Sequence, residues 1–159
     1  MAKKVSPIPK GYHGVTAYLC VNGAAAAITF YKKVLGAKEV MRIAAPGGRV
    51  GHAELEIGDS KIMLADESPN TGLKGPRSHG GSPVMLHLYV EKVDRVFARA
   101  VKAGATERQP PKDQFYGDRS ASFEDPFGHV WYVATHIENV SPKEMKRRAK
   151  EAMSGEPPA

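Results

Sequence analysis

The chain has little cysteine and tryptophan, and it lacks long apolar runs. It has 159 residues, with one cysteine and one tryptophan. Cys20 forms no internal disulfide and has no second thiol for a zinc or redox motif, so we expect a buried small residue. The apolar stretches fall well short of the roughly 20 residues of a membrane span. The first residues also lack the apolar segment of a signal peptide. The sequence therefore predicts no membrane partner and a cytoplasmic location.

Positive charge is concentrated at the two ends. The net charge is +6, and Lys3, Lys4 and Lys10 all precede residue 11. Residues 141–159 contain five basic and three acidic side chains, which leaves the middle nearly neutral. Basic ends of this kind favour solubility, with weak phosphate attraction as the alternative. A nucleic-acid partner is not expected.

Two segments repeat one pattern at a spacing of 69 residues: VTAYLCVNGAAAAITFYKKVLGA from Val15 and VMLHLYVEKVDRVFARAVKAGA from Val84. Each begins as an apolar strand, passes a polar turn and continues as a helix that ends at Gly36 or Gly104. Each is followed by a strand, a turn and a second strand, from His52 and from Ser120. The sequence predicts an α+β fold of two tandem β-α-β-β-β modules with mixed sheets.

Turn and cap residues set the expected boundaries. Short second strands are expected at Lys38–Ile43 and Glu107–Pro110, and SPKE at Ser141–Glu144 is a capping box that opens a cationic helix. Met145, Ala149 and Met153 give that helix an apolar stripe, which we expect to dock on the body or on a second subunit. The expected parts are a flexible segment 1–11, module one 12–66, a linker 67–83, module two 84–137, a helix 141–153 and a flexible tail 154–159.

The segment FEDPFGHVWYVATH, Phe123–His136, contains a predicted turn, which explains several of its residues without any catalytic or metal-binding role. Asp125 suits the first turn position, Pro126 fixes φ at the second, and Gly128 closes the turn. Together with FYKKVLGA and the doubled plan, DPFGHVW resembles the vicinal oxygen chelate superfamily, which includes glyoxalase I, extradiol dioxygenases and bleomycin-resistance proteins. The chain looks closest to its PhnB-like branch. The resemblance covers residues 12–137 and implies sheets curled around a cavity, and a homodimer.

The resemblance also implies four metal-ligand positions, one on the first and one on the last strand of each module. They correspond here to Thr16, Met63, Met85 and Tyr132. None of these is a good ligand for a hard or borderline divalent ion. We therefore expect no cofactor and no metal at the family's usual site.

Strand alternation selects the residues that share a face with those positions. If the turns between the strands have two residues, the face includes Arg119 and Phe123 beside Tyr132; a three-residue loop would reverse this. The candidate ligand-binding residues are Tyr18, His52, Glu54, Glu56, His87, Tyr89, Arg119, Phe123 and Tyr132.

Several of these residues permit two interpretations. His52, Glu54 and Glu56 could form a displaced divalent-metal site or an ordinary solvated strand face. His87 could act as a general base or as a hydrogen-bonded core histidine. Arg119 could bind an anionic ligand, or pair with Asp113 or Asp118.

The leading functional hypothesis is a small-molecule binding protein of bleomycin-resistance type, with a planar or aromatic ligand between aromatic walls. The alternative is a lyase, isomerase or dioxygenase-like enzyme that uses a displaced metal, or His87 and a glutamate. No catalytic residue is assigned by the sequence.

Overall fold

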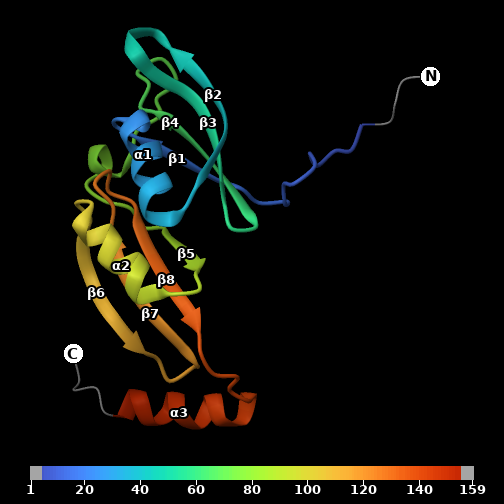
Figure 1. The fold of residues 1–159 in the computed structure, drawn as a ribbon, viewed down its shortest axis with the longest axis vertical. Helices are drawn as coiled ribbons and strands as arrows, with labels where there is room; N and C mark the ends of the chain where they lie inside the picture. Colours follow the sequence, from blue (N-terminus) through green and yellow to red (C-terminus); the bar gives the residue numbers. More distant parts are fainter. Residues whose placement is uncertain (1–4, 155–159) are drawn as a thin grey trace. The chain divides into compact units, whose positions relative to one another are not determined.

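The computed structural model describes residues 5–154, and the expectations for residues 1–4 and 155–159 lie outside this range. The chain divides into two compact units. Unit 1 comprises the residues up to Ser82 with Pro126–Gly128, and unit 2 comprises Pro83–Asp125 and the residues from His129 on. Figure 1 shows helix α1 with the sheet of unit 1, and helices α2 and α3 with the sheet of unit 2. The α+β fold of two βαβββ modules is confirmed, as are its mixed, curled sheets and its C-terminal helix.

Unit 1 contains a four-stranded sheet in the order β1-β4-β3-β2. β1 lies parallel to β4, and the other neighbours are antiparallel. Alternate residues of β3 are buried beneath the helix, namely Ala53, Leu55 and Ile57. Its elements are β1 (Ala17–Val21), α1 (Ala24–Leu35), β2 (Lys38–Ala45), β3 (Arg49–Ile57) and β4 (Ser60–Asp66).

Unit 2 repeats this topology in the order β5-β8-β7-β6, again with one parallel pair, β5 and β8. Helix α2 buries Val93, Val96, Phe97 and Ala100. The second strands, β2 and β6, are confirmed and are longer than predicted. The elements of unit 2 are β5 (Met85–Tyr89), α2 (Val93–Lys102), β6 (Thr106–Asp113), β7 (Asp118–Glu124), β8 (Val130–His136) and α3 (Pro142–Ser154).

The last strand of each module caps the helix of that module. In unit 1, Asp66 Oδ1 accepts hydrogen bonds from the backbone N–H groups of Gly23 and Ala24, and Oδ2 accepts one from Val50, at 2.7–2.8 Å. The matching residue of unit 2 is Thr135, whose hydroxyl accepts from Val93 N–H at 3.0 Å. Both side chains satisfy donors that a helix start leaves unpaired.

The DPFG turn is one residue longer than its counterpart. In unit 1, Ile57 pairs with Ser60, so the turn between β3 and β4 holds two residues. In unit 2, Asp125 N–H bonds the carbonyl oxygen of His129, which leaves a three-residue loop. Asp125 is buried and accepts from His129 N–H and from Trp131 Nε1–H.

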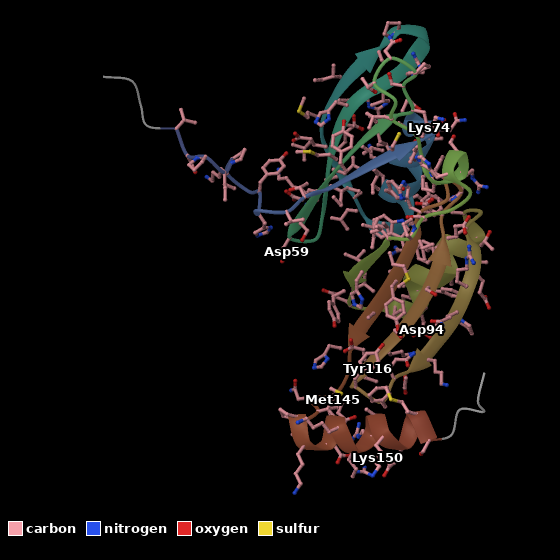
Figure 2. The ribbon with its side chains drawn as sticks, turned by 180° about the vertical axis from the view of Figure 1, so that it is seen from behind. Asp59, Lys74, Asp94, Tyr116, Met145 and Lys150 are labelled. Carbon is pink, nitrogen blue, oxygen red and sulfur yellow. The ribbon has the colours of Figure 1, made fainter. Side chains whose placement is uncertain are left out.

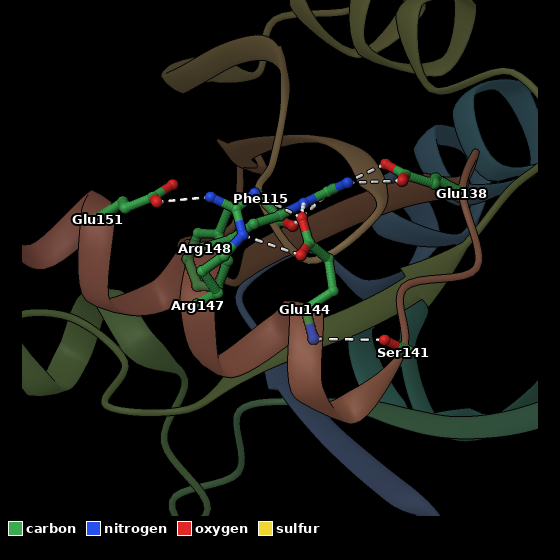
Figure 3. Close-up of polar contacts among 7 residues, drawn as sticks. All are labelled: Phe115, Glu138, Ser141, Glu144, Arg147, Arg148 and Glu151. Carbon is green, nitrogen blue, oxygen red and sulfur yellow. Dashed lines mark hydrogen bonds and ion pairs between the residues drawn. The ribbon is translucent and has the colours of Figure 1, made fainter.

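Helix α3 begins at the predicted cap and ends one residue beyond the prediction. Ser141 Oγ accepts a hydrogen bond from Glu144 N–H at 3.3 Å, but the Glu144 carboxylate binds Arg147 and Arg148 (Figure 3). Met145 and Ala149 are half-buried and Met153 is 70% exposed, so the apolar stripe docks in part. None of the helices in residues 5–154 is long and apolar enough to span a membrane.

The Asp66 cap yields a stability prediction. The substitution Asp66→Ala removes three hydrogen bonds to one carboxylate and should lower the free energy of unfolding by about 2 kcal/mol. Urea denaturation measures this loss. Asp59→Ala, in the exposed β3–β4 turn, is the matched control and should change it by less than about 0.5 kcal/mol. Equal losses in the two variants would contradict the capping role of Asp66.

Candidate functional site

The sheet of unit 1 has an open face opposite α1. Tyr18 lies opposite Met63, and Met63 lies opposite Glu54, so these side chains share that face. Strand alternation adds His52 and Glu56 from β3 and Cys20 from β1. The predicted face of module one is therefore correct, because its two-residue turn preserves the expected register.

Four polar side chains form a hydrogen-bonded chain across this face. Tyr18 Oη lies 2.9 Å from His52 Nδ1, and His52 Nε2 lies 3.4 Å from Glu54 Oε1. Tyr12 donates its hydroxyl proton to the other oxygen of Glu54. That hydrogen bond raises the pKa of Tyr12 to about 12 and lowers the pKa of Glu54. Burial raises the pKa of Tyr18.

The partners in this hydrogen-bonded chain indicate which ring nitrogen of His52 carries a proton. Glu54 is an acceptor when ionised, so His52 Nε2 carries the proton and Nδ1 accepts from the Tyr18 hydroxyl. Tyr12, at the start of module one, was not among the predicted site residues. A tyrosine before the first strand has no periodic signal that would place it on a sheet face.

The open face of unit 2 carries stacked rings and hydroxyl groups. His87 lies opposite Tyr132, which in turn lies opposite Ser122. The His87 ring centroid is 4.8 Å from that of Tyr89 and 5.1 Å from that of Tyr132. Tyr89 is 61% exposed, so solvent or a ligand can reach this ring stack.

Three hydroxyl groups meet next to this stack. Tyr132 Oη lies 2.8 Å from Tyr116 Oη and 2.7 Å from Ser120 Oγ. Burial, together with the hydrogen bond to Tyr132, raises the pKa of Tyr116 to about 12. Figure 2 shows Tyr116 at the end of the sheet beside α3. We name Tyr116, Tyr132 and Ser120 the hydroxyl cluster.

A buried carboxylate completes the face. Asp118 is 4% exposed and accepts hydrogen bonds from Tyr89 Oη at 2.9 Å and from His136 Nδ1 at 2.7 Å. His136 Nε2 lies 3.0 Å from Asn139 Oδ1. The bond to Asp118 raises the pKa of Tyr89, and the bonds to Asp118 and Asn139 raise the pKa of His136.

The placement of Arg119 and Phe123 on the face of Tyr132 is wrong. Glu124 pairs with Val130 across the three-residue loop, so Ser120 and Ser122 share the face of Tyr132 instead. Phe123 is fully buried on the face that packs against α2. Arg119 binds both carboxylate oxygens of Asp94, at 2.7 and 2.8 Å, and Asp113 at 2.8 Å. It links α2 to the end of β6, and of the two expected partners only Asp113 is observed.

Within residues 5–154, no group of three or more His, Cys, Asp or Glu side chains is arranged to hold a metal ion. The Glu54 carboxylate is hydrogen-bonded to Tyr12 and His52. Among the described residues, His52 and Glu54 have no third His, Cys, Asp or Glu side chain arranged with them as a metal ligand. Thr16, Met63, Met85 and Tyr132 supply only hydroxyl and thioether groups. These donors do not fit a hard or borderline divalent ion.

A small pocket in unit 1 contains none of the predicted site residues. It has a volume of about 120 Å³ and lies beside Arg49, Asp66 and Glu67. Asp66 accepts three backbone hydrogen bonds, and Glu67 accepts from Gly75 N–H and the Ser78 hydroxyl. Its carboxylates are therefore engaged in holding the loop rather than presented to a ligand.

Comparison with known proteins identifies the class. The model of the Glyoxalase/Bleomycin resistance protein/Dioxygenase superfamily matches residues 13–133. The chain belongs to this superfamily, which confirms the resemblance seen in the sequence.

Relatives extend over most of the chain. An uncharacterized protein of Mycobacterium bovis is 42% identical over 132 residues, which cover 81% of this chain and 87% of that protein. A solved structure of an Arabidopsis thaliana gene product has 28% identity and a TM-score of 0.64, over 77% of this chain and 98% of that one. The PhnB protein of Bacillus cereus has 19% identity and a TM-score of 0.60, over 77% and 99% respectively, and shows the shared fold.

The Asp118–His136 pair predicts a pH dependence. Because the pKa of His136 is raised above its ordinary value of 6.5, the pair stabilises the protein fully below that value. This stabilisation is lost as the pH rises through the raised pKa. A histidine NMR titration should show the raised pKa in the wild type and a lower one in Asp118→Asn. An unchanged pKa in that variant would contradict the assignment.

Proposed function

We propose that the protein binds a small planar or aromatic molecule on the open face of unit 2, without the usual metal site of the family. The observation that carries this proposal is the hydroxyl cluster beside the His87 ring stack. Aromatic rings favour offset or tilted contact with a flat ligand, and the exposed Tyr89 and His87 leave room for such contact.

The hydroxyl cluster defines the polar part of the ligand. Tyr132 is hydrogen-bonded to Tyr116 and to Ser120, and Ser120 also interacts with Tyr116. A hydroxyl group can rotate its proton toward a new partner, so a hydrogen-bond acceptor on the ligand could replace one of these contacts. Lys112 lies opposite Ser120 in the register and adds a positive charge on the same face. The favoured ligand is an aromatic carboxylate or a related anion.

The remaining expectations stay proposals as well. The superfamily's usual homodimer is the expected assembly, and sedimentation velocity would test it. A displaced divalent-metal site on His52, Glu54 or Glu56 of unit 1 also stays a proposal. Its test is the metal content of the protein after exposure to zinc, manganese, iron and nickel. A cytoplasmic location and the absence of a nucleic-acid partner also remain expectations from charge and composition.

The binding proposal is tested with 2-naphthoate, followed by isothermal titration calorimetry. Wild-type protein should bind it, and Tyr132→Phe should weaken binding roughly fivefold, because one hydrogen bond of about 1 kcal/mol is lost. Tyr12→Phe removes a hydroxyl from unit 1 and should leave the affinity unchanged. No binding by the wild type at millimolar concentration, or equal weakening in both variants, would count against the proposal.

A second candidate function is acid–base catalysis on unit 1. The chain from Tyr18 through His52 to Glu54 favours it, since a carboxylate that orients a histidine is a common proton-transfer arrangement. The transfer would move a proton from carbon next to a carbonyl group to the His52–Tyr18 pair and return it to the same or another atom. No oxidant or reductant is required.

Phenylpyruvate in deuterium oxide tests this second function. Catalysis should exchange the protons at C3 faster than buffer does, and His52→Ala should reduce the rate about 100-fold. His79→Ala changes an exposed histidine outside both open faces and serves as the control. Exchange at the buffer rate, or equal losses in both variants, would remove this candidate.

A further inference from the structure

Arg148 joins helix α3 to the body of unit 2. Its guanidinium donates to both carboxylate oxygens of Glu138, at 2.7 and 2.8 Å (Figure 3). It also donates to Glu144 at 2.8 Å and to the backbone carbonyl oxygen of Phe115 at 3.3 Å. A forked contact of this kind fixes direction as well as distance. Arg148 therefore holds α3 against the turn between β6 and β7.

That turn is also held by the segment that leads into α3. The carbonyl oxygen of Gly117 accepts hydrogen bonds from Ile137 N–H at 2.9 Å and Glu138 N–H at 3.0 Å. Gly117 has φ +98°, and an added Cβ would lie 2.2 Å from Glu138 O. Only glycine fits this approach without displacement. The turn and the start of the C-terminal segment thus form one packed joint.

The same turn carries Tyr116 to the hydroxyl cluster. The rings of Phe115 and Tyr116 meet edge to face, with centroids 5.3 Å apart, and the Tyr116 hydroxyl lies 2.8 Å from that of Tyr132. A continuous set of contacts therefore runs from Arg148 through residues 115–117 to Tyr132.

We propose that docking of α3 through Arg148 positions Tyr116 and thereby controls ligand binding at the open face of unit 2. This inference rests on the proposed binding function and adds a means of regulating it. Arg148 is a positioning residue, because it acts through Phe115 and Tyr116. Release of α3 would free the turn, separate Tyr116 from Tyr132 and disrupt the hydroxyl cluster that contacts the ligand.

The neighbouring arginine provides a matched control. Arg147 donates to Glu144 at 2.6 and 2.9 Å and to Glu151 at 2.5 Å, so its ion pairs stay within α3. Arg147→Gln removes the same charge from the same helix without touching the joint. Arg148→Gln removes the contacts that hold α3 to the joint. Glu138→Gln weakens the same contacts by changing the residue that accepts them.

Hydrogen exchange of the full chain measures the joint without any ligand. Backbone exchange at residues 114–117 and 137–138 should become at least about tenfold faster in Arg148→Gln and Glu138→Gln, since their hydrogen bonds open locally. Arg148→Lys keeps the charge but loses the fork, and should give an intermediate rate. Arg147→Gln should match the wild type. Equal acceleration in Arg147→Gln and Arg148→Gln, or none in either, would overturn the positioning role.

Affinity for 2-naphthoate then tests control of the site. Arg148→Gln should weaken binding roughly as much as Tyr116→Phe, about fivefold, and the double variant should lose little more than either single one. Additive losses, or wild-type affinity in Arg148→Gln, would overturn control through Tyr116. If the wild type does not bind 2-naphthoate, the binding function fails, while the exchange result still decides whether Arg148 holds the turn.

Discussion

The alternation of side chains along a strand is the constraint on which both open faces depend. One extra residue in a turn moves every side chain of the preceding strand to the opposite face relative to its partner. The β3–β4 turn has two residues and the β7–β8 loop has three. The same strand order therefore presents His52 and Glu54 on the open face of unit 1, and Ser120 and Ser122 on that of unit 2.

This difference gives the two units separate chemistry. In unit 1, Tyr18, His52 and Glu54 form a hydrogen-bonded chain suited to accepting or relaying protons. In unit 2 the side chains next to Tyr132 are hydroxyls, and the buried Asp118 is already occupied by Tyr89 and His136. A face of hydroxyls and rings suits binding through donated hydrogen bonds. The asymmetry supports ligand binding by unit 2 and makes unit 1 the better place to seek acid–base chemistry.

Much of the fold could be predicted because its signals are local. Gly36 ends α1 with φ +69°, as its position after an apolar helix indicates, and Ser141 caps α3. The face of β3 was also predictable, because Ala53, Leu55 and Ile57 alternate with polar residues. β7 lacks this signal: its small side chains, including Ala121 and Ser122, give no clear apolar face. The predicted face of Arg119 and Phe123 therefore depends on turn length alone, and the β7–β8 loop has three residues instead of two.

The site residues that the sequence did not predict have one physical property in common. Tyr116 lies in a turn and its hydroxyl meets that of Tyr132, while the next residue, Gly117, passes close to Glu138. Asp118 and His136 meet through the pairing of β7 with β8. Such contacts depend on register and on close backbone approach, which no periodic pattern records. The sequence could predict the rings of the open face, but not the polar groups that orient a ligand there.

The most direct test of the account is an NMR titration of tyrosine-labelled protein with 2-naphthoate. We predict that the signals of Tyr89, Tyr116 and Tyr132 shift together with saturation, while those of Tyr12 and Tyr18 in unit 1 remain in place. Shifts confined to Tyr12 and Tyr18 would place the ligand on the other unit and contradict the central claim. Unchanged signals from all five would contradict it as well.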